Sequence, residues 1–297
     1  MLNITTPTET VIADLVSRYD YFMLDIWGVV YDGTTLYPGV LETLTKLANL
    51  KKNILFLSNA PLPATTVMER LSYLGIEVAE PQILTSGDLV RQRFQYNDDP
   101  VFTQFHDPFY HFGVHQSDGI LSGLSVNSVD SLEKARYILF SRYLDEGDNL
   151  DQFLDFFQQA LALELPIICP NPDKEIVNGK KLRYCAGYFA EQYENMGGVV
   201  YYYGKPYPAV YQEALKRFGI VSSPGKIANI LMVGDTLETD IAGANRIEID
   251  SALVLTGNTG TLLKNNDIQN EMRLPFLNQV FTKNSLAPTW IIPSFGF

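Results

Sequence analysis

YFMLDIWGVVYDG, residues 21–33, is an apolar run that ends at a single carboxylate, Asp25, and continues into a glycine-containing turn. Three further segments have the same form: ILFL ends at Ser58-Asn59, VVYYY at Gly204-Lys205, and ILMV at Gly234-Asp235. These runs are apolar throughout rather than alternating, which is typical of strands buried on both faces of a parallel sheet. A polar residue at the end of such a strand is well placed to act as a nucleophile or a metal ligand.

Helical patterns follow several of these runs. Residues 67–74 and 210–218 repeat apolar side chains at helical spacing, and a glycine ends each pattern. The alternation predicts an α/β fold, with right-handed βαβ units in a doubly wound parallel sheet. Ligands bind beyond the carboxyl ends of the strands in such sheets. We expect four side chains at that edge: Asp25, Ser58, Lys205 and Asp235.

The middle of the chain differs from the rest in composition and pattern. It opens with the aromatic-rich VFTQFHDPFYHFG and contains an apolar stripe at helical spacing between Leu150 and Leu161, which we interpret as core. A further apolar run, residues 165–169, leads into a polar loop. We therefore predict a second α/β domain, residues 99–198, inserted into a core domain made of residues 1–98 and 199–297.

Composition limits the class of protein. The 297 residues carry a net charge of −12, and this acidity opposes binding to nucleic acid or to an anionic membrane surface. Any phosphate-bearing ligand would need a local cation, such as a metal or a lysine. Two cysteines imply no disulfide framework, MLNITTPTET does not read as a signal peptide, and no apolar run reaches the roughly 18 residues of a membrane span. We expect a cytoplasmic protein.

A second motif, ILMVGDTLETDIAGA, occupies residues 230–244. The strand delivers Asp235, Thr239 is placed to cap a helix, and Asp240 lies in the first turn of that helix. An aspartate at a strand end often only caps a helix. Together with Asp25, however, it offers oxygen ligands from separate chain segments, as a hard divalent cation requires.

With these motifs in hand, the chain resembles the haloacid dehalogenase-type (HAD) superfamily of hydrolases, and within it the class IIA sugar and nucleotide phosphatases. Four motifs occur in order: DIWGVVYDG, LFLSNA, YYYGKPYP and VGDTLETD. The resemblance covers nearly the whole chain, because that group inserts its cap between the second and third motifs. It implies a Rossmann-like core with an inserted C2-type α/β cap domain.

The resemblance also implies roles for individual residues. Asp25 would attack phosphorus and become an aspartyl phosphate. Mg²⁺ would be held by the carboxylates of Asp25 and Asp235 and by the backbone carbonyl of Trp27, with Asp240 acting nearby or through water. The phosphoryl group would be bound by Ser58, by a backbone N–H at Asn59 and by Lys205, which also neutralises Asp25. Such positioning and cationic stabilisation is what phosphoryl transfer needs.

Residue 27 departs from the family pattern. The family places a second aspartate there, which protonates the leaving group and then activates water, and an indole does neither. General acid–base assistance is worth about 10²–10⁴-fold, or about 3–5 kcal/mol of barrier. Three interpretations stay open: another acid replaces it, with Asp32 the nearest candidate or else part of a plain turn; the enzyme is slow or uses good leaving groups; or the protein binds phosphate without turnover.

The stretch CPNPDKEIVNGKKLRYCAG, residues 169–187, matches the substrate-choosing loop of the cap. Asn171, Asp173 and Arg183 would reach the leaving group, Arg183 suiting an anionic one; alternatively they form a solvated surface loop. The resemblance implies a small phosphorylated metabolite, a sugar phosphate or nucleotide-like compound, as substrate. A homodimer through the caps would also fit the resemblance.

The histidines and cysteines offer weaker candidates. His106, His111 and His115 lie close in sequence, but glycine and aromatic residues among them argue against a helix, and no further ligand completes a zinc set. No histidine partners Cys185, so we interpret that thiol as packed rather than nucleophilic. The apolar C-terminal APTWIIPSFGF is expected to dock onto the core.

Overall fold

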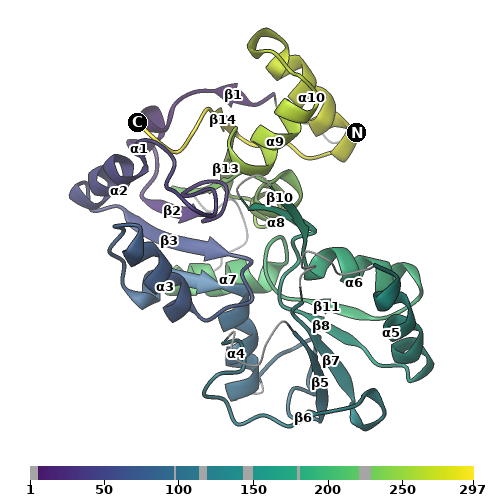
Figure 1. Cartoon of the computed structure of the whole chain (residues 1–297). Coiled ribbons are helices and arrows are strands. Elements are labelled where there is room, and N and C mark those ends of the chain that lie inside the picture. Colours follow the sequence, from purple (N-terminus) through teal and green to yellow (C-terminus); the bar gives the residue numbers. More distant parts are fainter. Residues whose placement is uncertain (1–5, 97, 114–118, 143–149, 179–180, 221–228) are drawn as a thin grey trace.

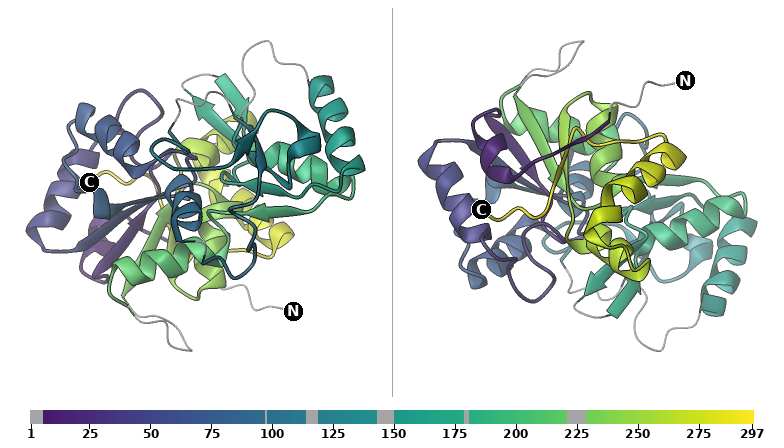
Figure 2. Two further views of the ribbon diagram at one scale, coloured as in Figure 1. Left: turned by 90° about the horizontal axis from the view of Figure 1, so that it is seen from below. Right: turned by 90° about the horizontal axis from the view of Figure 1, so that it is seen from above.

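The chain builds two parallel sheets, each covered by helices (Figure 1). The computed structural model describes residues 6–96, 98–113, 119–142, 150–178, 181–220 and 229–297. In both views of Figure 2 the middle of the chain, coloured teal, lies to one side of the purple and blue N-terminal segments. The predicted α/β architecture with an inserted second α/β unit is thus confirmed.

The first sheet has seven strands in the order β1-β14-β13-β12-β2-β3-β4, and all neighbouring pairs are parallel. Apart from the edge strand β1, chain order runs outward in opposite directions from the β2–β12 pair, which makes this pair the topological switch point where doubly wound sheets bind ligands. The strands are β1 (Thr8–Glu9), β2 (Tyr21–Leu24), β3 (Asn53–Ser58), β4 (Ile83–Thr85), β12 (Ile230–Gly234), β13 (Asp250–Val254) and β14 (Trp290–Ile292).

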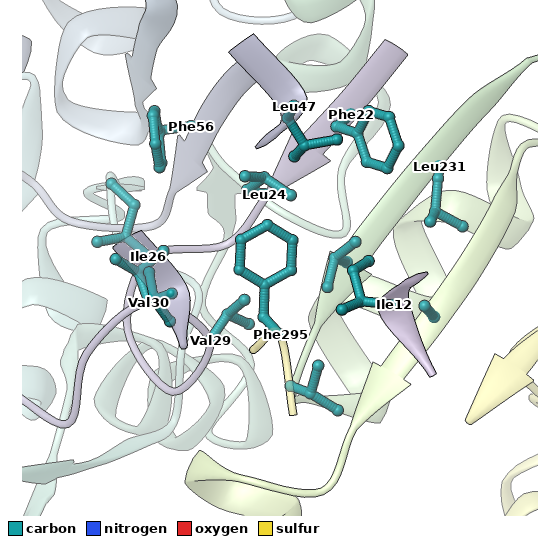
Figure 3. Close-up of a cluster of buried hydrophobic side chains, with 14 of the residues drawn as sticks. Ile12, Phe22, Leu24, Ile26, Val29, Val30, Leu47, Phe56, Leu231 and Phe295 are labelled. Carbon is teal, nitrogen blue, oxygen red and sulfur yellow. The ribbon is translucent and has the colours of Figure 1, made fainter. Parts of the chain in front are cut away.

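Helices cover both faces of this sheet, because successive side chains of each strand point to opposite faces. On one face Phe22, Leu24 and Phe56 pack against the first three helices and against Phe295 (Figure 3). Phe295 is fully buried, so the C-terminal segment docks as predicted. The helices on this face are α1 (Ile12–Val16), α2 (Val40–Asn49) and α3 (Ala64–Tyr73).

The opposite face of the first sheet is covered by later helices. Met23, Leu55 and Met232 point to this face and pack in one cluster with residues of α4, α7 and α8. A separate cluster joins α9 and α10 to β13 and β14. These helices are α4 (Ser86–Tyr96), α7 (Pro208–Arg217), α8 (Ala242–Arg246), α9 (Gly257–Asn265) and α10 (Arg273–Asn284), with short helical turns at Glu80–Gln82 and Asn270–Met272.

The second sheet has five parallel strands in the order β11-β8-β7-β5-β6. Two helices cover one face, where Phe153, Phe157 and Phe189 are buried; Leu154, expected in the same apolar stripe, is exposed. The elements are β5 (Phe109–Phe112), β6 (Ser128–Val129), a helical turn (Leu132–Lys134), β7 (Tyr137–Phe140), α5 (Leu150–Ala162), β8 (Ile167–Cys169), α6 (Ala186–Asn195) and β11 (Val200–Tyr202). An antiparallel hairpin, β9 (Glu175–Asn178) and β10 (Lys181–Tyr184), projects from it.

One strand lies in a different sheet from the one predicted. The run 199–203 reads as a core strand, but β11 pairs with β8 as an edge of the second sheet. The chain therefore returns to the first sheet only after Tyr202. An apolar run reports burial and not the neighbour against which the strand pairs, which explains the error. The remaining domain bounds stay a prediction.

The two sheets share a continuous apolar cluster. Leu57 of the first sheet and Leu139 of the second belong to the same buried group, together with Phe94 of α4 and the aromatic rings of Phe102 and Phe105. Side chains from both sheets and from the segment that connects them therefore pack the second sheet onto the first. This packing holds the second sheet against the first.

Candidate active site

The site forms where β2 and β12 lie side by side. Asp25 follows the last residue of β2, and Asp235 follows the last residue of β12. The parallel pairing places Leu24 beside Val233, and the Asp25 N–H donates to the carbonyl of Val233 at 2.9 Å. Two carboxylates that lie 210 residues apart in sequence are thus neighbours because their strands are.

Three carboxylates meet here. Asp25, Asp235 and Asp240 each offer an oxygen within 4.8 Å of the others. Their residues are only 6%, 3% and 1% exposed. Buried carboxylates at this density repel one another and require a cation.

Lys205 supplies part of that charge. Its ammonium donates to Asp25 Oδ1 at 2.5 Å and to Asp240 Oδ1 at 2.6 Å, and the residue is 2% exposed. Burial by itself lowers the pKa of Lys205, but the attraction of Asp240 and Asp25 raises it well above its usual value. The expected meeting of Asp25, Asp235 and Lys205 at one edge is therefore seen in the structure.

The charge balance at the site is incomplete. One ammonium faces three carboxylates, so these groups sum to −2 when all are ionised. Burial raises the pKa of Asp25 well above its usual range, an effect that Lys205 opposes and the other two aspartates reinforce. Burial, followed by repulsion from Asp240, raises the pKa of Asp235 to about 7. A divalent cation between these oxygens would relieve both effects.

Asp240 supports Lys205 rather than pointing a free oxygen at a ligand. Its Oδ1 accepts from Lys205, and its Oδ2 accepts from the Thr236 N–H at 3.1 Å. The prediction that Thr239 caps a helix is wrong, because Thr239 lies inside a π-helical turn, Leu237–Ile241. The hydrogen bond to a backbone N–H at the start of this turn is made instead by the Asp240 carboxylate, which accepts from Thr236.

Glycine lets the loop after β2 approach Asp235. Gly28 has φ +88°, in the left-handed region, and a Cβ added to it would lie 2.3 Å from Asp235 Oδ2. The Gly28 carbonyl accepts a hydrogen bond from Thr256 Oγ1 at 2.5 Å. Asp235 Oδ2 in turn accepts from the Asn258 N–H at 2.5 Å. The Asn258 N–H on Oδ2 and the Thr236 hydroxyl on Oδ1, at 3.2 Å, thus hold the Asp235 carboxylate in place.

Asn59 connects three parts of the site through its side chain. Its Oδ1 accepts from the Lys205 N–H at 2.7 Å, while its Nδ2 donates to the Lys205 carbonyl at 2.9 Å and to Asp173 Oδ1 at 2.8 Å. Sequence reasoning assigned only the backbone of Asn59 a role. Ser58 Oγ accepts from the Ala60 N–H at 3.2 Å, so its own proton remains available for donation.

Of the predicted loop 169–187, the part between β8 and β9 reaches the site, and the rest includes the β9–β10 hairpin. Asp173 is partly buried beside Asn59, and Asn171, 8% exposed, accepts from the Asp173 N–H at 3.1 Å. Arg183 lies on β10. The alternative of a solvated surface loop does not fit Asn171 and Asp173. The loop thus brings polar groups of the inserted domain against the first sheet.

A cavity of about 520 Å³ lies between the two domains. Its wall on the core side includes Ile26, Trp27 and Ser58, the sequence neighbours of Asp25 and Asn59. Trp27 is partly exposed, and its ring lies 5.0 Å from that of Tyr31. The wall from the inserted domain includes His111, Ser141, Asn171, Asp173, Arg183 and Cys185. The cavity is the space in which a ligand would meet these groups.

Asp32 forms a turn. Its Oδ1 accepts from the Thr34 N–H at 2.9 Å and from the Thr35 N–H at 2.8 Å, as an Asx turn does. Burial tends to raise the pKa of Asp32, but these hydrogen bonds lower it below its usual value overall. An ionised carboxylate that faces its own turn is a poor proton donor. Of the two open interpretations of Asp32, the structure favours the turn.

The histidines and Cys185 lie in different environments. His111 lines the cavity, with Nε2 2.9 Å from Ser141 Oγ, and sequence reasoning considered it only as a metal ligand. His106 is exposed and His115 lies outside the described residues. Burial raises the pKa of Cys185 above its usual range, consistent with a packed thiol. Arg70, at the cavity wall on α3, carried no sequence signal because exposed helical arginines are common.

Two segments of the chain match known protein families. Residues 22–113 match a family model described as haloacid dehalogenase-like hydrolase, and residues 202–275 match one described as HAD-hydrolase-like. The chain belongs to the haloacid dehalogenase-like hydrolase superfamily. The two matched segments contain Asp25, Ser58, Lys205 and Asp235.

Individual members of the superfamily resemble the chain over most of its length. Sugar-phosphatase AraL of Bacillus subtilis is 25% identical over 241 residues, covering 79% of this chain and 82% of that protein. Mouse chronophin is 25% identical over 256 residues, covering 82% and 83%. Among solved structures, a haloacid dehalogenase-like hydrolase from Brucella suis 1330 superposes with a TM-score of 0.72 at 29% identity, covering 85% and 90%. The p-nitrophenyl phosphatase of Archaeoglobus fulgidus shares the fold, with a TM-score of 0.70 at 24% identity, covering 94% and 97%.

Within the described parts of the chain, every helix is too short or too polar to cross a bilayer.

Proposed function

We propose that this phosphoric monoester hydrolase is a class IIA, Mg²⁺-dependent phosphatase of a small phosphorylated metabolite. The observation that carries the proposal is the Lys205 ammonium between Asp25 and Asp240, with Asp235 in the same acidic cluster. A cavity begins at Ile26, the residue after Asp25, and is also lined by Ser58. A nucleophilic carboxylate, a buried cation and a ligand-sized space are the components that phosphoryl transfer from a monoester requires.

The donor set fits a magnesium ion. Hard divalent cations prefer carboxylate and carbonyl oxygens, and the buried cluster of Asp25, Asp235 and Asp240 carries more negative charge than Lys205 offsets. Asp25, Asp235 and the Trp27 carbonyl would hold the ion, with Asp240 behind them because both of its oxygens already accept hydrogen bonds. When bound, the ion would supply positive charge to the phosphoryl oxygens and to the attacking carboxylate.

The chain's own residues account for the first chemical step. Asp25 attacks phosphorus and forms an aspartyl phosphate, which water then hydrolyses. Lys205 stabilises the charge on the phosphoryl group and holds Asp25 Oδ1 in place. The Ser58 hydroxyl and the Asn59 N–H donate to phosphoryl oxygens. These donors are oriented before substrate arrives, which is the basis of electrostatic catalysis.

The cavity supports a small organic substrate. About 520 Å³ lies within the range of roughly 300–1,000 Å³ typical of small-molecule sites. Apolar residues, Arg183 and Asn171 share its wall, which suits a leaving group with both carbon surface and polar substituents. We infer a sugar phosphate or a nucleotide-like compound, in keeping with relatives named sugar-phosphatase and acid sugar phosphatase.

The alternative, a phosphate-binding protein without turnover, rests on Trp27 alone. The nucleophile, the lysine and the acidic cluster are all assembled, which favours an enzyme. We also propose a cytoplasmic location, supported by two buried, unpaired cysteines. The net charge of −12 speaks against a nucleic-acid or anionic membrane partner. The homodimer stays a prediction.

Assay of a panel of sugar phosphates, nucleotides and p-nitrophenyl phosphate, with Mg²⁺ or with EDTA, tests the proposal. We expect Mg²⁺-dependent phosphate release that Asp25→Asn abolishes, and a phosphorylated enzyme whose modified residue maps to Asp25. The matched control is Asp130→Asn, which alters an exposed carboxylate paired with Lys134 on the inserted domain. No release from any compound, together with intact binding of a phosphate mimic, would support the non-catalytic alternative.

A further inference from the structure

Hydrolysis through an aspartyl phosphate needs two proton transfers. The leaving oxygen takes up a proton when its bond to phosphorus breaks, and the attacking water loses one in the second step. Trp27 has no acidic or basic group for either transfer. Asp32 faces its own turn. A side chain that supplies these protons must therefore be another one at the cavity.

Asp173 is the single carboxylate among the described residues that line the cavity. Its Oδ1 accepts from Asn59 Nδ2 at 2.8 Å, and Asn59 in turn bonds both the N–H and the carbonyl of Lys205. One side chain therefore separates Asp173 from the residue that holds Asp25. Ser58, the proposed hydrogen-bond donor to the phosphoryl group, precedes Asn59 and lines the same cavity as Asp173. These contacts join Asp173 through Asn59 to the backbone of Lys205, and the shared cavity brings Asp173 and Ser58 to the same ligand space.

The hydrogen bond from Asn59 also orients the carboxyl group. It engages Oδ1, which leaves Oδ2 to carry a proton. Burial raises the pKa of Asp173 above its usual value; Lys205 and the Asn59 hydrogen bond lower it, and Asp240 raises it again. The nearby thiol of Cys185 is itself kept protonated, because burial raises its pKa. A carboxyl group in such surroundings is able to alternate between its acid and its base form.

We propose that Asp173 is the proton donor and acceptor of the reaction, taking the place of the carboxylate absent at residue 27. This inference rests on the proposed function. As Asp25 attacks and the bond from phosphorus to the leaving oxygen breaks, Asp173 gives its proton to that oxygen. Asp173 then takes a proton from the water that attacks the aspartyl phosphate. Inorganic phosphate leaves, Asp25 is free again, and Asp173 is again protonated.

Two aryl phosphates with different leaving groups test this role. Nitrophenolate leaves from p-nitrophenyl phosphate without a proton, whereas the phenolate of phenyl phosphate is about as basic as tyrosine, with a pKa of about 10. Asp173→Asn keeps an oxygen for the Asn59 hydrogen bond but carries no transferable acid proton. We expect kcat/KM for phenyl phosphate to fall about 10²–10⁴-fold and that for p-nitrophenyl phosphate to fall less than about tenfold.

The second proton transfer gives an independent signature. Asp173→Asn should release one equivalent of nitrophenolate in a burst and then turn over slowly, because the phosphorylated enzyme accumulates when water is not activated. Asp173→Ser repeats both measurements should the Asn variant be unstable, with thermal unfolding recorded for each. Asp130→Asn, at an exposed carboxylate of the same domain, is the control and should retain the wild-type ratio of the two substrates.

The outcomes separate the two proposals. Equal losses of kcat/KM with both substrates and no burst would show that Asp173 only positions Asn59. Wild-type kinetics would show that Asp173 neither transfers a proton nor positions Asn59. Each result overturns the inference. Both leave the proposed function intact, provided that Asp25→Asn abolishes hydrolysis of p-nitrophenyl phosphate. If Asp25→Asn remains active, the proposed function fails and this inference fails with it.

Discussion

Replacing Lys205 by methionine should be among the most costly single changes in this protein. The ammonium is 2% exposed and lies 2.5 Å and 2.6 Å from carboxylate oxygens of Asp25 and Asp240. Methionine fills a similar volume but leaves two buried carboxylates beside each other with no cation. Removing one partner of a buried pair costs about 3–5 kcal/mol, which is a large share of a typical stability of about 5–15 kcal/mol.

Urea unfolding of the metal-free protein, followed by far-ultraviolet circular dichroism, measures this cost. The midpoint should fall for Lys205→Met while the slope m stays constant, because the surface exposed on unfolding does not change. The double variant Lys205→Met with Asp25→Asn should recover part of the loss, since an amide needs no counter-charge. Lys134→Met, which breaks an exposed pair with Asp130, is the control and should leave the midpoint close to that of the wild type.

The reasoning would be refuted if Lys205→Met were no less stable than Lys134→Met. Such a result would mean that the three carboxylates hold protons in the folded state and that Lys205 contributes little to the site. Partial recovery in the double variant would not then be seen either.

Three further predictions concern residues around the cluster. Gly28→Ala places a Cβ 2.3 Å from Asp235 Oδ2 at a φ of +88°, so we expect a loss of about 1–3 kcal/mol in unfolding free energy and loss of Mg²⁺-dependent phosphate release. Asp32→Asn keeps an acceptor for its turn, so the ratio of phenyl to p-nitrophenyl phosphate hydrolysis should match that of the wild type. In EDTA, the pKa of Asp235 is about 7 in the folded protein and about 4 in the unfolded chain. The folded state therefore holds a proton that the unfolded chain has released, and the unfolding free energy should decrease as the pH rises from about 4 to about 7. Asp235→Asn should flatten that slope in urea titrations.

The first sheet and the position of its site follow from local sequence. Each apolar run that ends in a polar residue is short enough to be a strand, and burial on both faces requires covering helices. Parallel strands bring their carboxyl ends to one edge, so Asp25 and Asp235 could be placed together without coordinates. Predicting which residues lie at this edge needed only the local sequence and the parallel arrangement of the strands.

Contacts between distant side chains could not be predicted in the same way. The run 199–203 is as apolar as the core strands, yet β11 extends the edge of the second sheet. The bonds from Asn59 to Lys205 and Asp173 span 146 and 114 residues, and nothing in the local pattern of an Ser-Asn pair reports them. The turn that holds Asp240 depends on π-helical backbone, which a helical periodicity does not distinguish from an ordinary first turn.

The position of Asp173 has a consequence for how the two domains cooperate. A proton donor on the loop after β2 would be present whether or not the inserted domain is docked, whereas Asp173 belongs to the loop after β8. Proton transfer by Asp173 therefore requires the second sheet to lie against the first. The apolar cluster that contains Leu57 and Leu139 supplies that contact, since it is continuous between the sheets. Tryptophan at residue 27 is then compatible with turnover, because the acid lost from one wall of the cavity is provided by the opposite wall.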